Sequence, residues 1–161
     1  MRHGDRMNWE PLISLRIPGP GVAMGRPRFN RYTGGARIPA KTRRYLWLVE
    51  AIQEKASYGL DLPIPKGTPI KVRIEAVYSR PTSQFRKKDP DHQLAHTKRP
   101  DLDNVIKSVN DGLKNLWVDD SQVCCIEAIK KVGAIVDRKT KTSELARVDV
   151  SVWTGDSLEE L

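Results

Sequence analysis

Hydrophobic and polar residues alternate in several segments of this chain, which is the pattern of a β-strand that buries one face. The most regular case is residues 70–78, in which nearly every second residue is apolar and the others are mostly charged. The sequence Tyr-Thr-Gly-Gly at residues 32–35 predicts a hairpin turn, with residues 36–38 as a short return strand. Weaker alternation predicts further strands over residues 12–17, 123–132 and 145–153.

Two other segments place their apolar residues three or four positions apart, which predicts amphipathic helices. The first covers residues 41–58 and stops before Gly59. The second covers residues 102–116, where six apolar residues form one stripe: Leu102, Val105, Ile106, Val109, Leu113 and Leu116.

This order of elements predicts an α+β fold, a small mixed β-sheet with the two main helices packed on one face. A chain of 161 residues is the size of one domain. We expect that domain to span residues 12–153, between an N-terminal extension over residues 1–11 and an acidic tail over residues 154–161. Residues 80–98 show no periodicity, and we expect them to form a mobile loop.

Basic residues gather in two stretches of the chain, which carries a formal net charge of +8. Residues 26–44 contain seven basic side chains and no acidic one, and residues 80–99 contain six basic side chains against two acidic ones. Such stretches favour a polyanion as partner, and DNA phosphates are the obvious case. A solvated basic surface is the alternative for either stretch alone.

The sequence favours a cytoplasmic protein. It has no apolar run of the roughly 20 residues that a membrane helix needs, and its N-terminus lacks the apolar core of a signal peptide. The adjacent Cys124 and Cys125 are expected to be small strand residues, which agrees with a reducing compartment.

Acidic residues cluster around the second predicted helix. Pro100 favours an extended Arg99, so Asp101 can precede or cap the helix and Asp103 can lie in its first turn. Lys107 and Asp111 follow Asp103 at intervals of four, on a stripe separate from the apolar one.

A short connector then leads to Asp119 and Asp120, which can bring their carboxylates back toward the helix. Carboxylate oxygens suit a hard cation such as Mg²⁺. A cation held there could support phosphodiester hydrolysis, with a lysine stabilising the developing charge.

Simpler interpretations exist for each part of this cluster. Asp101 and Asp103 could serve only to cap the helix, Asp103 and Lys107 could be a surface ion pair, and Asp119–Asp120 could form a turn. An EF-hand is excluded, because Ile106 occupies the position where that loop requires glycine. The three histidines (His3, His92 and His96) are scattered, and we expect none of them to bind zinc.

The complete combination resembles a known family. The run RPDLDNVIKSVNDGL followed by WVDDSQV is similar to the signature of RusA-type Holliday-junction resolvases. The segments IPGPGVAMGRPRF and PAKTRRY are similar to the N-terminal half of the same family. The resemblance covers roughly residues 12–153, and it is poor over residues 80–98.

This resemblance implies a small homodimeric nuclease that needs Mg²⁺ or Mn²⁺ and nicks opposing strands of four-way DNA junctions in recombination and repair. It also implies a bacterial host cell and a phage or prophage origin. The residues implied as metal ligands are Asp101, Asp103 and Asp120, with Lys107 as the essential lysine. The connector before Asp120 is slightly short for the family, so Asp119 is an alternative ligand, although we favour Asp120.

We therefore predict a metal-dependent endodeoxyribonuclease in which Lys107 stabilises the transition state or positions the attacking water. Phe29 could wedge into the junction centre, or it could simply belong to the hairpin or the core. The alternatives are a non-catalytic protein that binds branched DNA and a less selective nuclease that acts on flaps or forks. The residues predicted to contact the DNA backbone are Arg26, Arg28, Lys41, Arg43, Lys98 and Arg99, and Lys130 lies where the family tends to carry a basic residue.

Overall fold

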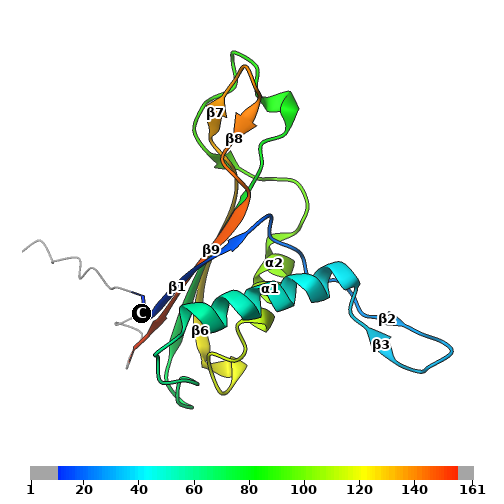
Figure 1. Cartoon of the computed structure of the whole chain (residues 1–161), viewed down its shortest axis with the longest axis vertical. Coiled ribbons are helices and arrows are strands. Elements are labelled where there is room, and N and C mark those ends of the chain that lie inside the picture. Colours follow the sequence, from blue (N-terminus) through cyan, green and yellow to red (C-terminus); the bar gives the residue numbers. More distant parts are fainter. Residues whose placement is uncertain (1–10, 156–161) are drawn as a thin grey trace, which may run out of the picture.

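A computed structural model describes residues 11–155 of the protein, and its centre is a mixed β-sheet (Figure 1). The five strands lie in the order β1-β9-β4-β6-β5. Strand β4 runs parallel to β6, and the other neighbouring pairs are antiparallel. The strands are β1 (Ile13–Pro18), β4 (Ile70–Tyr78), β5 (Leu94–Ala95), β6 (Val123–Val132) and β9 (Arg147–Thr154).

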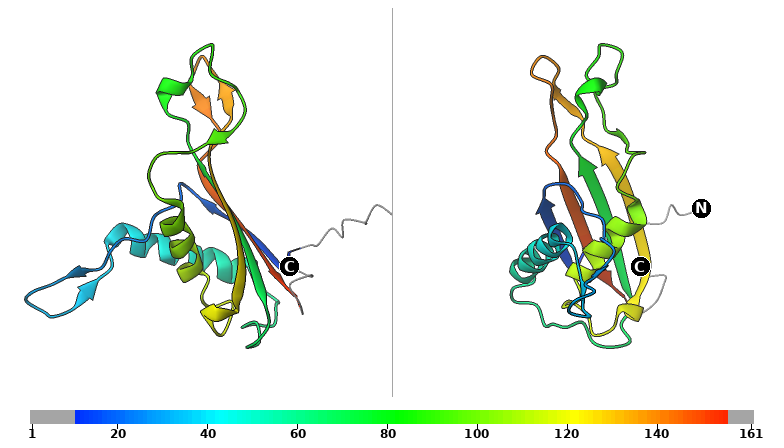
Figure 2. Two further views of the ribbon diagram at one scale, coloured as in Figure 1. Left: turned by 180° about the vertical axis from the view of Figure 1, so that it is seen from behind. Right: turned by 90° about the vertical axis from the view of Figure 1, so that its right-hand side faces the viewer.

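The helices α1 (Ala40–Ala56) and α2 (Leu102–Gly112) cover one face of this sheet, as Figure 2 shows. The predicted α+β fold is therefore confirmed. Helix α2 ends four residues before the prediction, at Gly112. Leu113 and Leu116 remain completely buried beyond the end of the helix, so the apolar stripe continues through a turn that the periodicity alone does not distinguish from a helix.

The core lies between the helices and the sheet. Ile17 of β1, Ile74 of β4 and Val148 of β9 face Val49 of α1 and Val109 of α2, and all five have no exposed surface. The opposite face of the sheet is polar and carries ion pairs between neighbouring strands. These pairs are Arg16–Asp149 at 2.6 Å, Lys71–Glu127 at 2.8 Å and Lys131–Glu75 at 2.8 Å.

A register shift explains why the alternation in β6 is imperfect. Ile70 pairs with Val123, whereas Lys71 pairs with Cys125, so Cys124 is one extra residue in β6. Beyond this point Ala128 and Lys130 lie beside Ile74 and Ala76 on the helix-covered face. Both cysteines lie in β6 as free thiols, in agreement with the prediction.

Two parts of the chain project from this body (Figure 1). One is a hairpin formed by β2 (Arg28–Phe29) and β3 (Ala36–Arg37), which precedes α1. The other is a lobe that contains β7 (Ile135–Asp137), β8 (Thr142–Ser143) and the 3-10 helix η1 (Thr82–Gln84).

Residues 80–98, which we expect to form a mobile loop, carry two short regular elements in this structure. The segment contains η1 and β5, and β5 pairs with the end of β6. Arg80 is 5% exposed and donates to the carbonyls of Gly133 at 2.9 Å, Pro90 at 2.7 Å and His92 at 2.5 Å. The buried Arg80 guanidinium thus binds carbonyls up to 53 positions away in the chain. Local periodicity does not predict such contacts.

The predicted extension over residues 1–11 and the predicted tail over residues 154–161 lie almost entirely outside the described residues. In the part of the chain that the structure describes, no helix is long and apolar enough to cross a membrane.

Candidate active site

The N-terminal end of α2 presents the first two acidic residues of the cluster. Asp101 occupies the N-cap position with an extended backbone (φ −70°, ψ 138°), yet its side chain makes no capping hydrogen bond. Its backbone oxygen accepts from the Val105 amide at 3.2 Å. Capping therefore does not account for the Asp101 carboxylate, and Asp103 lies in the first turn as predicted.

Three side chains from one stripe of α2 line a hollow that we call the acidic hollow. They are Asp103, Lys107 and Asp111, and they face Trp117 and Asp120 from the segment that follows the helix. The remaining lining residues are Ile106, Asn110, Val123 and Ile126. The structure thus brings together Asp103, Lys107 and Asp120 of the four predicted catalytic residues.

Asp101 does not line the acidic hollow. It lines another hollow at the N-terminal end of α2, together with Arg26, Arg99 and Asn104. The loop that precedes β2 places Arg26 there, because the Met24 amide donates to the carbonyl of Asn104 at 2.9 Å. Ser108 of α2 also donates to the carbonyl of Val22 in the same loop.

A close approach to the core fixes the beginning of this loop. A Cβ atom at Gly21 would lie 2.9 Å from both the hydroxyl oxygen of Tyr78 and Cγ1 of Val105. The Tyr78 hydroxyl donates to the carbonyl of Gly21 at 2.9 Å, and burial raises the pKa of Tyr78 to about 12. The position of Arg26 beside Asp101 therefore depends on a glycine five residues before it.

Asp119 and Asp120 have different environments, and of the two only Asp120 lines the acidic hollow. Asp119 caps the 3-10 helix η2 (Asp120–Gln122), where its carboxylate accepts from the Ser121 amide at 2.9 Å. That hydrogen bond lowers the pKa of Asp119. Gln122 completes a capping box by accepting from the Asp119 amide at 2.9 Å.

Asp120 faces the acidic hollow instead. Its Oδ1 accepts a hydrogen bond from the indole Nε1 of Trp117 at 3.0 Å. Trp117 is 3% exposed, so a residue anchored in the core orients this carboxylate. Asp119 lines a separate hollow with Lys66 and Cys124.

Asn110 is a further residue of the acidic hollow that the sequence analysis did not identify. Its Oδ1 is buried and makes no hydrogen bond within residues 11–155. An orphaned acceptor beside three carboxylates is a feature that a cation or water would satisfy. The signal was present in the sequence, because Asn110 follows Asp103 by two helical turns.

The oxygen atoms of the acidic hollow have the chemistry that a hard cation prefers, although they do not form a complete cage. Within residues 11–155, no group of three or more His, Cys, Asp or Glu side chains is arranged to hold a metal ion. Mg²⁺ commonly takes only one or two carboxylates, and substrate phosphates and water supply the remaining ligands. The donor set therefore fits such a cation.

The Lys130 ammonium binds the protein's own backbone. Its Nζ donates to the carbonyls of Lys98 and Pro100, at 2.5 Å each. Both carbonyls belong to the segment that leads into Asp101, so the ammonium fixes the path of the chain at the start of α2. Lys130 is thus half-buried, with two backbone carbonyls as partners of its ammonium.

The other six residues predicted to contact DNA are all exposed. Arg26 and Arg99 lie beside Asp101, and Lys41 and Arg43 lie in the first turn of α1. Arg28 lies on β2 and Lys98 precedes Arg99. An acidic hollow with a lysine, next to exposed arginines, is typical of enzymes that cleave phosphodiesters.

Comparison with known proteins supports this class. A family model described as "Endodeoxyribonuclease RusA" matches residues 18–152, so the chain belongs to the RusA endodeoxyribonuclease family, as its motifs indicate. The chain is also similar to the uncharacterized protein YqaN of Bacillus subtilis strain 168. The two are 30% identical over 122 residues, which cover 73% of this chain and 86% of that protein.

Proposed function

We propose that this protein resolves four-way DNA junctions by paired, symmetric nicks, and that a divalent cation, Mg²⁺ or Mn²⁺, acts at the acidic hollow. The observation that carries the proposal is the meeting of Asp103, Lys107 and Asp120 around one hollow in a RusA-family chain. Residues 12–153 would act as a single nuclease domain in the cytoplasm of a bacterial host, encoded by a phage or prophage.

We assign the cation to Asp103 and Asp120, and Asp101, the third carboxylate, would join them by turning from its own hollow toward the acidic one. When bound, the cation would supply Lewis-acid chemistry, by activating water and offsetting negative charge on the phosphodiester. The uncapped side chain of Asp101 and the orphaned Oδ1 of Asn110 support this assignment.

The protein's own side chains would orient the reaction. Lys107 projects from α2 into the same hollow as both carboxylates, where its ammonium can stabilise charge on a phosphoryl oxygen or position the attacking water. Trp117 would hold Asp120 through its indole N–H. Lys130 would act as a positioning residue for Asp101 through the carbonyls of Lys98 and Pro100.

The exposed basic side chains around the hollow would bind the DNA backbone, which positions the substrate without reading its sequence. Arg26 and Arg99 flank Asp101, and Arg28, Lys41, Arg43 and Lys98 extend the basic surface on either side. Symmetric nicking needs two equivalent sites, and a two-fold homodimer would supply them.

The decisive experiment is the cleavage of an end-labelled synthetic four-way junction, with Mg²⁺ and with EDTA. We expect paired nicks from the wild type with Mg²⁺ only, and a loss on the order of 100-fold or more in Asp103→Asn. Asp61→Asn is the matched control, because Asp61 is an exposed carboxylate in the connector after α1.

Unchanged cleavage by Asp103→Asn would contradict the proposed site. Tight junction binding without cleavage would favour a non-catalytic branched-DNA binding protein. Equal cleavage of junctions, flaps and forks would favour a less selective nuclease.

A further inference from the structure

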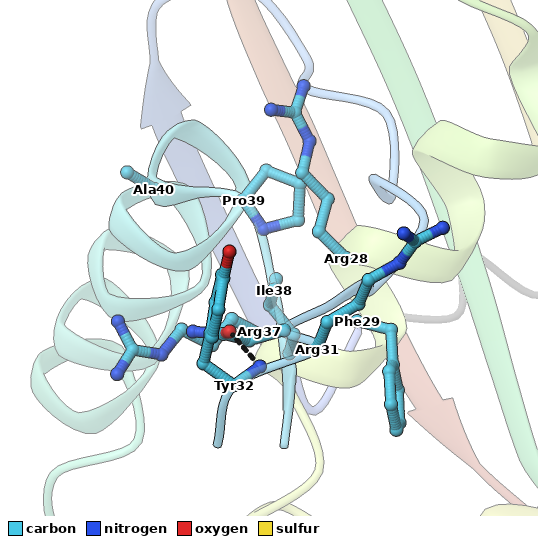
Figure 3. Close-up of a pocket in the computed structure, with 9 residues that line it drawn as sticks. Arg28, Phe29, Arg31, Tyr32, Arg37, Ile38, Pro39 and Ala40 are labelled. Atoms are coloured by element: carbon cyan, nitrogen blue, oxygen red, sulfur yellow. Dashed lines mark hydrogen bonds between the residues drawn. The ribbon is translucent and has the colours of Figure 1, made fainter. Parts of the chain in front are cut away.

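The β2–β3 hairpin and the start of α1 enclose a second hollow, separate from the acidic one (Figure 3). We call it the hairpin hollow. Its lining includes three arginines and two aromatic residues, namely Arg28, Arg31, Arg37, Phe29 and Tyr32, and it includes no acidic residue. Its composition is thus the reverse of that of the acidic hollow.

The aromatic rings of the hairpin contribute little to the folded core. Tyr32 is 98% exposed and Phe29 is 72% exposed. In Figure 3 the ring of Tyr32 points toward the start of α1, whereas the ring of Phe29 points the opposite way. Aromatic side chains left in water beside arginines are typical of a binding surface rather than of a core.

The turn of the hairpin is nevertheless well defined. The Asn30 side chain accepts from the Tyr32 amide at 2.9 Å, and the Asn30 and Gly34–Gly35 backbones form two hydrogen bonds of 3.0 Å each. Gly34 has a φ of 66°, which a glycine adopts without strain. The hairpin therefore presents Tyr32 at a fixed place, although the ring contacts little.

We propose that the hairpin hollow is a binding site for single-stranded DNA, in which Tyr32 stacks on an unpaired base and Arg28, Arg31 and Arg37 bind the adjoining phosphates. Aromatic stacking tolerates any base, and guanidinium groups supply the electrostatic attraction. A base inside a duplex is already stacked between its neighbours, so the exposed ring favours an unpaired strand.

Charge argues against the same hollow of a second copy as the occupant. The hollow is lined by three arginines without an acid. Two such surfaces repel each other, whereas a DNA strand is complementary to both the charge and the rings.

The hairpin hollow also connects to the catalytic region along the chain. Arg28 lies two residues after Arg26, and Arg26 shares a hollow with Asp101. Where the proposed nuclease function holds, a strand displaced at a branch point would pass from the hairpin toward the start of α2. The hairpin would thereby favour DNA with an unpaired segment over uninterrupted duplex.

The test measures binding without cleavage, by fluorescence anisotropy of labelled oligo(dT) and of a labelled duplex in EDTA. We expect Tyr32→Ala to weaken oligo(dT) binding by about tenfold and duplex binding much less. Tyr32→Phe keeps the ring and is expected to bind like the wild type. Tyr58→Ala is the matched control, because Tyr58 is 94% exposed just beyond the opposite end of α1.

The arginines are tested through salt dependence. Arg31→Gln is expected to reduce the slope of log K against log salt for oligo(dT) by about 0.7, the value for one phosphate contact to a single strand. Circular dichroism melts check that each variant folds, since the changed side chains are exposed.

Wild-type affinity of Tyr32→Ala for oligo(dT), or an equal loss in Tyr58→Ala, would overturn the inference. These readouts do not depend on catalysis, so they separate the two proposals. A protein that binds oligo(dT) through Tyr32 but cuts no junction would retain this site and lose the proposed function. If the wild type cuts junctions and Tyr32→Ala binds oligo(dT) as tightly as the wild type, the proposed function would stand and this binding site would be rejected.

Discussion

The indole nitrogen of Trp117 donates to Oδ1 of Asp120 across 3.0 Å, so a buried residue of the core orients an exposed carboxylate of the acidic hollow. Replacing the indole by the smaller ring of phenylalanine removes this donor and keeps an aromatic side chain in the core. We expect Trp117→Phe to lower junction cleavage by about 10- to 100-fold, as loss of a group that orients a metal ligand commonly does.

The informative measurement for this variant is the dependence of the cleavage rate on Mg²⁺ concentration, which should shift to higher concentrations if Asp120 holds the cation less well. Trp47→Phe serves as control, because Trp47 is 60% exposed on α1. An unchanged Mg²⁺ dependence in Trp117→Phe would show that the hydrogen bond has no functional role.

The neighbouring acids Asp119 and Asp120 should respond differently to the same substitution. Asp120→Asn is expected to reduce cleavage about 100-fold or more, because the carboxylate facing the hollow is lost. Asp119→Asn should keep its activity and stability, since asparagine caps helices as well as aspartate does. The measurement is the cleavage rate of each variant under single-turnover conditions. A larger loss in Asp119→Asn than in Asp120→Asn would identify Asp119 as the ligand.

The two lysines at positions 130 and 131 point to opposite faces of the sheet. Lys130 binds the carbonyls before Asp101, whereas Lys131 pairs with Glu75 at 2.8 Å on the open face. We expect Lys130→Met to lower the cleavage rate by about tenfold or more while junction affinity in EDTA stays near the wild-type value. Lys131→Met should leave both quantities unchanged, and a loss of affinity in Lys130→Met would instead indicate direct DNA contact.

Helices α1 and α2 pack tightly at Gly112, where an added Cβ would lie 2.6 Å from Cβ of Val49. We expect Gly112→Ala to destabilise the protein by about 1–3 kcal/mol through overpacking, measured by urea denaturation. Gly35→Ala is the control, because its nearest atom would be the Thr33 hydroxyl oxygen at 3.9 Å. Val49→Gly removes the contacted Cβ, so the loss in the double variant Gly112→Ala/Val49→Gly should be smaller than the sum of the two single losses, and additive losses would place the clash elsewhere.

His96 should make the protein less stable in mild acid. Burial, together with the nearby charge of Lys130, lowers the pKa of His96 below its ordinary value of 6.5. The unfolded chain therefore takes up a proton as the pH falls through about 6.5, while the folded protein still resists protonation, and the free energy of unfolding decreases.

Phenylalanine at position 96 retains the stacking on Tyr78, whose ring centroid lies 4.7 Å away, and removes the titration. Thermal melts from pH 7.5 to pH 5.5 should show a smaller loss of stability in His96→Phe than in the wild type. If the melting temperatures of both proteins fall equally with pH, His96 does not cause this pH dependence.

The local pattern of the chain was sufficient to predict most of the central elements. Strand β4 and the first turns of both helices agree with their predicted positions, because alternation and helical spacing report directly which side of an element is buried. The same spacing placed Asp103, Lys107 and Asp111 on one stripe of α2, and the structure has all three in the acidic hollow.

Side-chain hydrogen bonds, which hydrophobic periodicity does not report, decided the rest. Some are local, such as those from the Trp117 indole to Asp120 and from the Asp119 amide to Gln122, three residues apart. Others are long-range, since Lys130 binds carbonyls 30 and 32 residues away. Arg80 likewise orders a segment that its own composition predicts to be a loop. By itself, then, the sequence determined the elements and the chemical types of the site residues. The tertiary structure decided which side chains meet. Only the folded sheet brings the joined segments close enough for hydrogen bonds of about 3 Å.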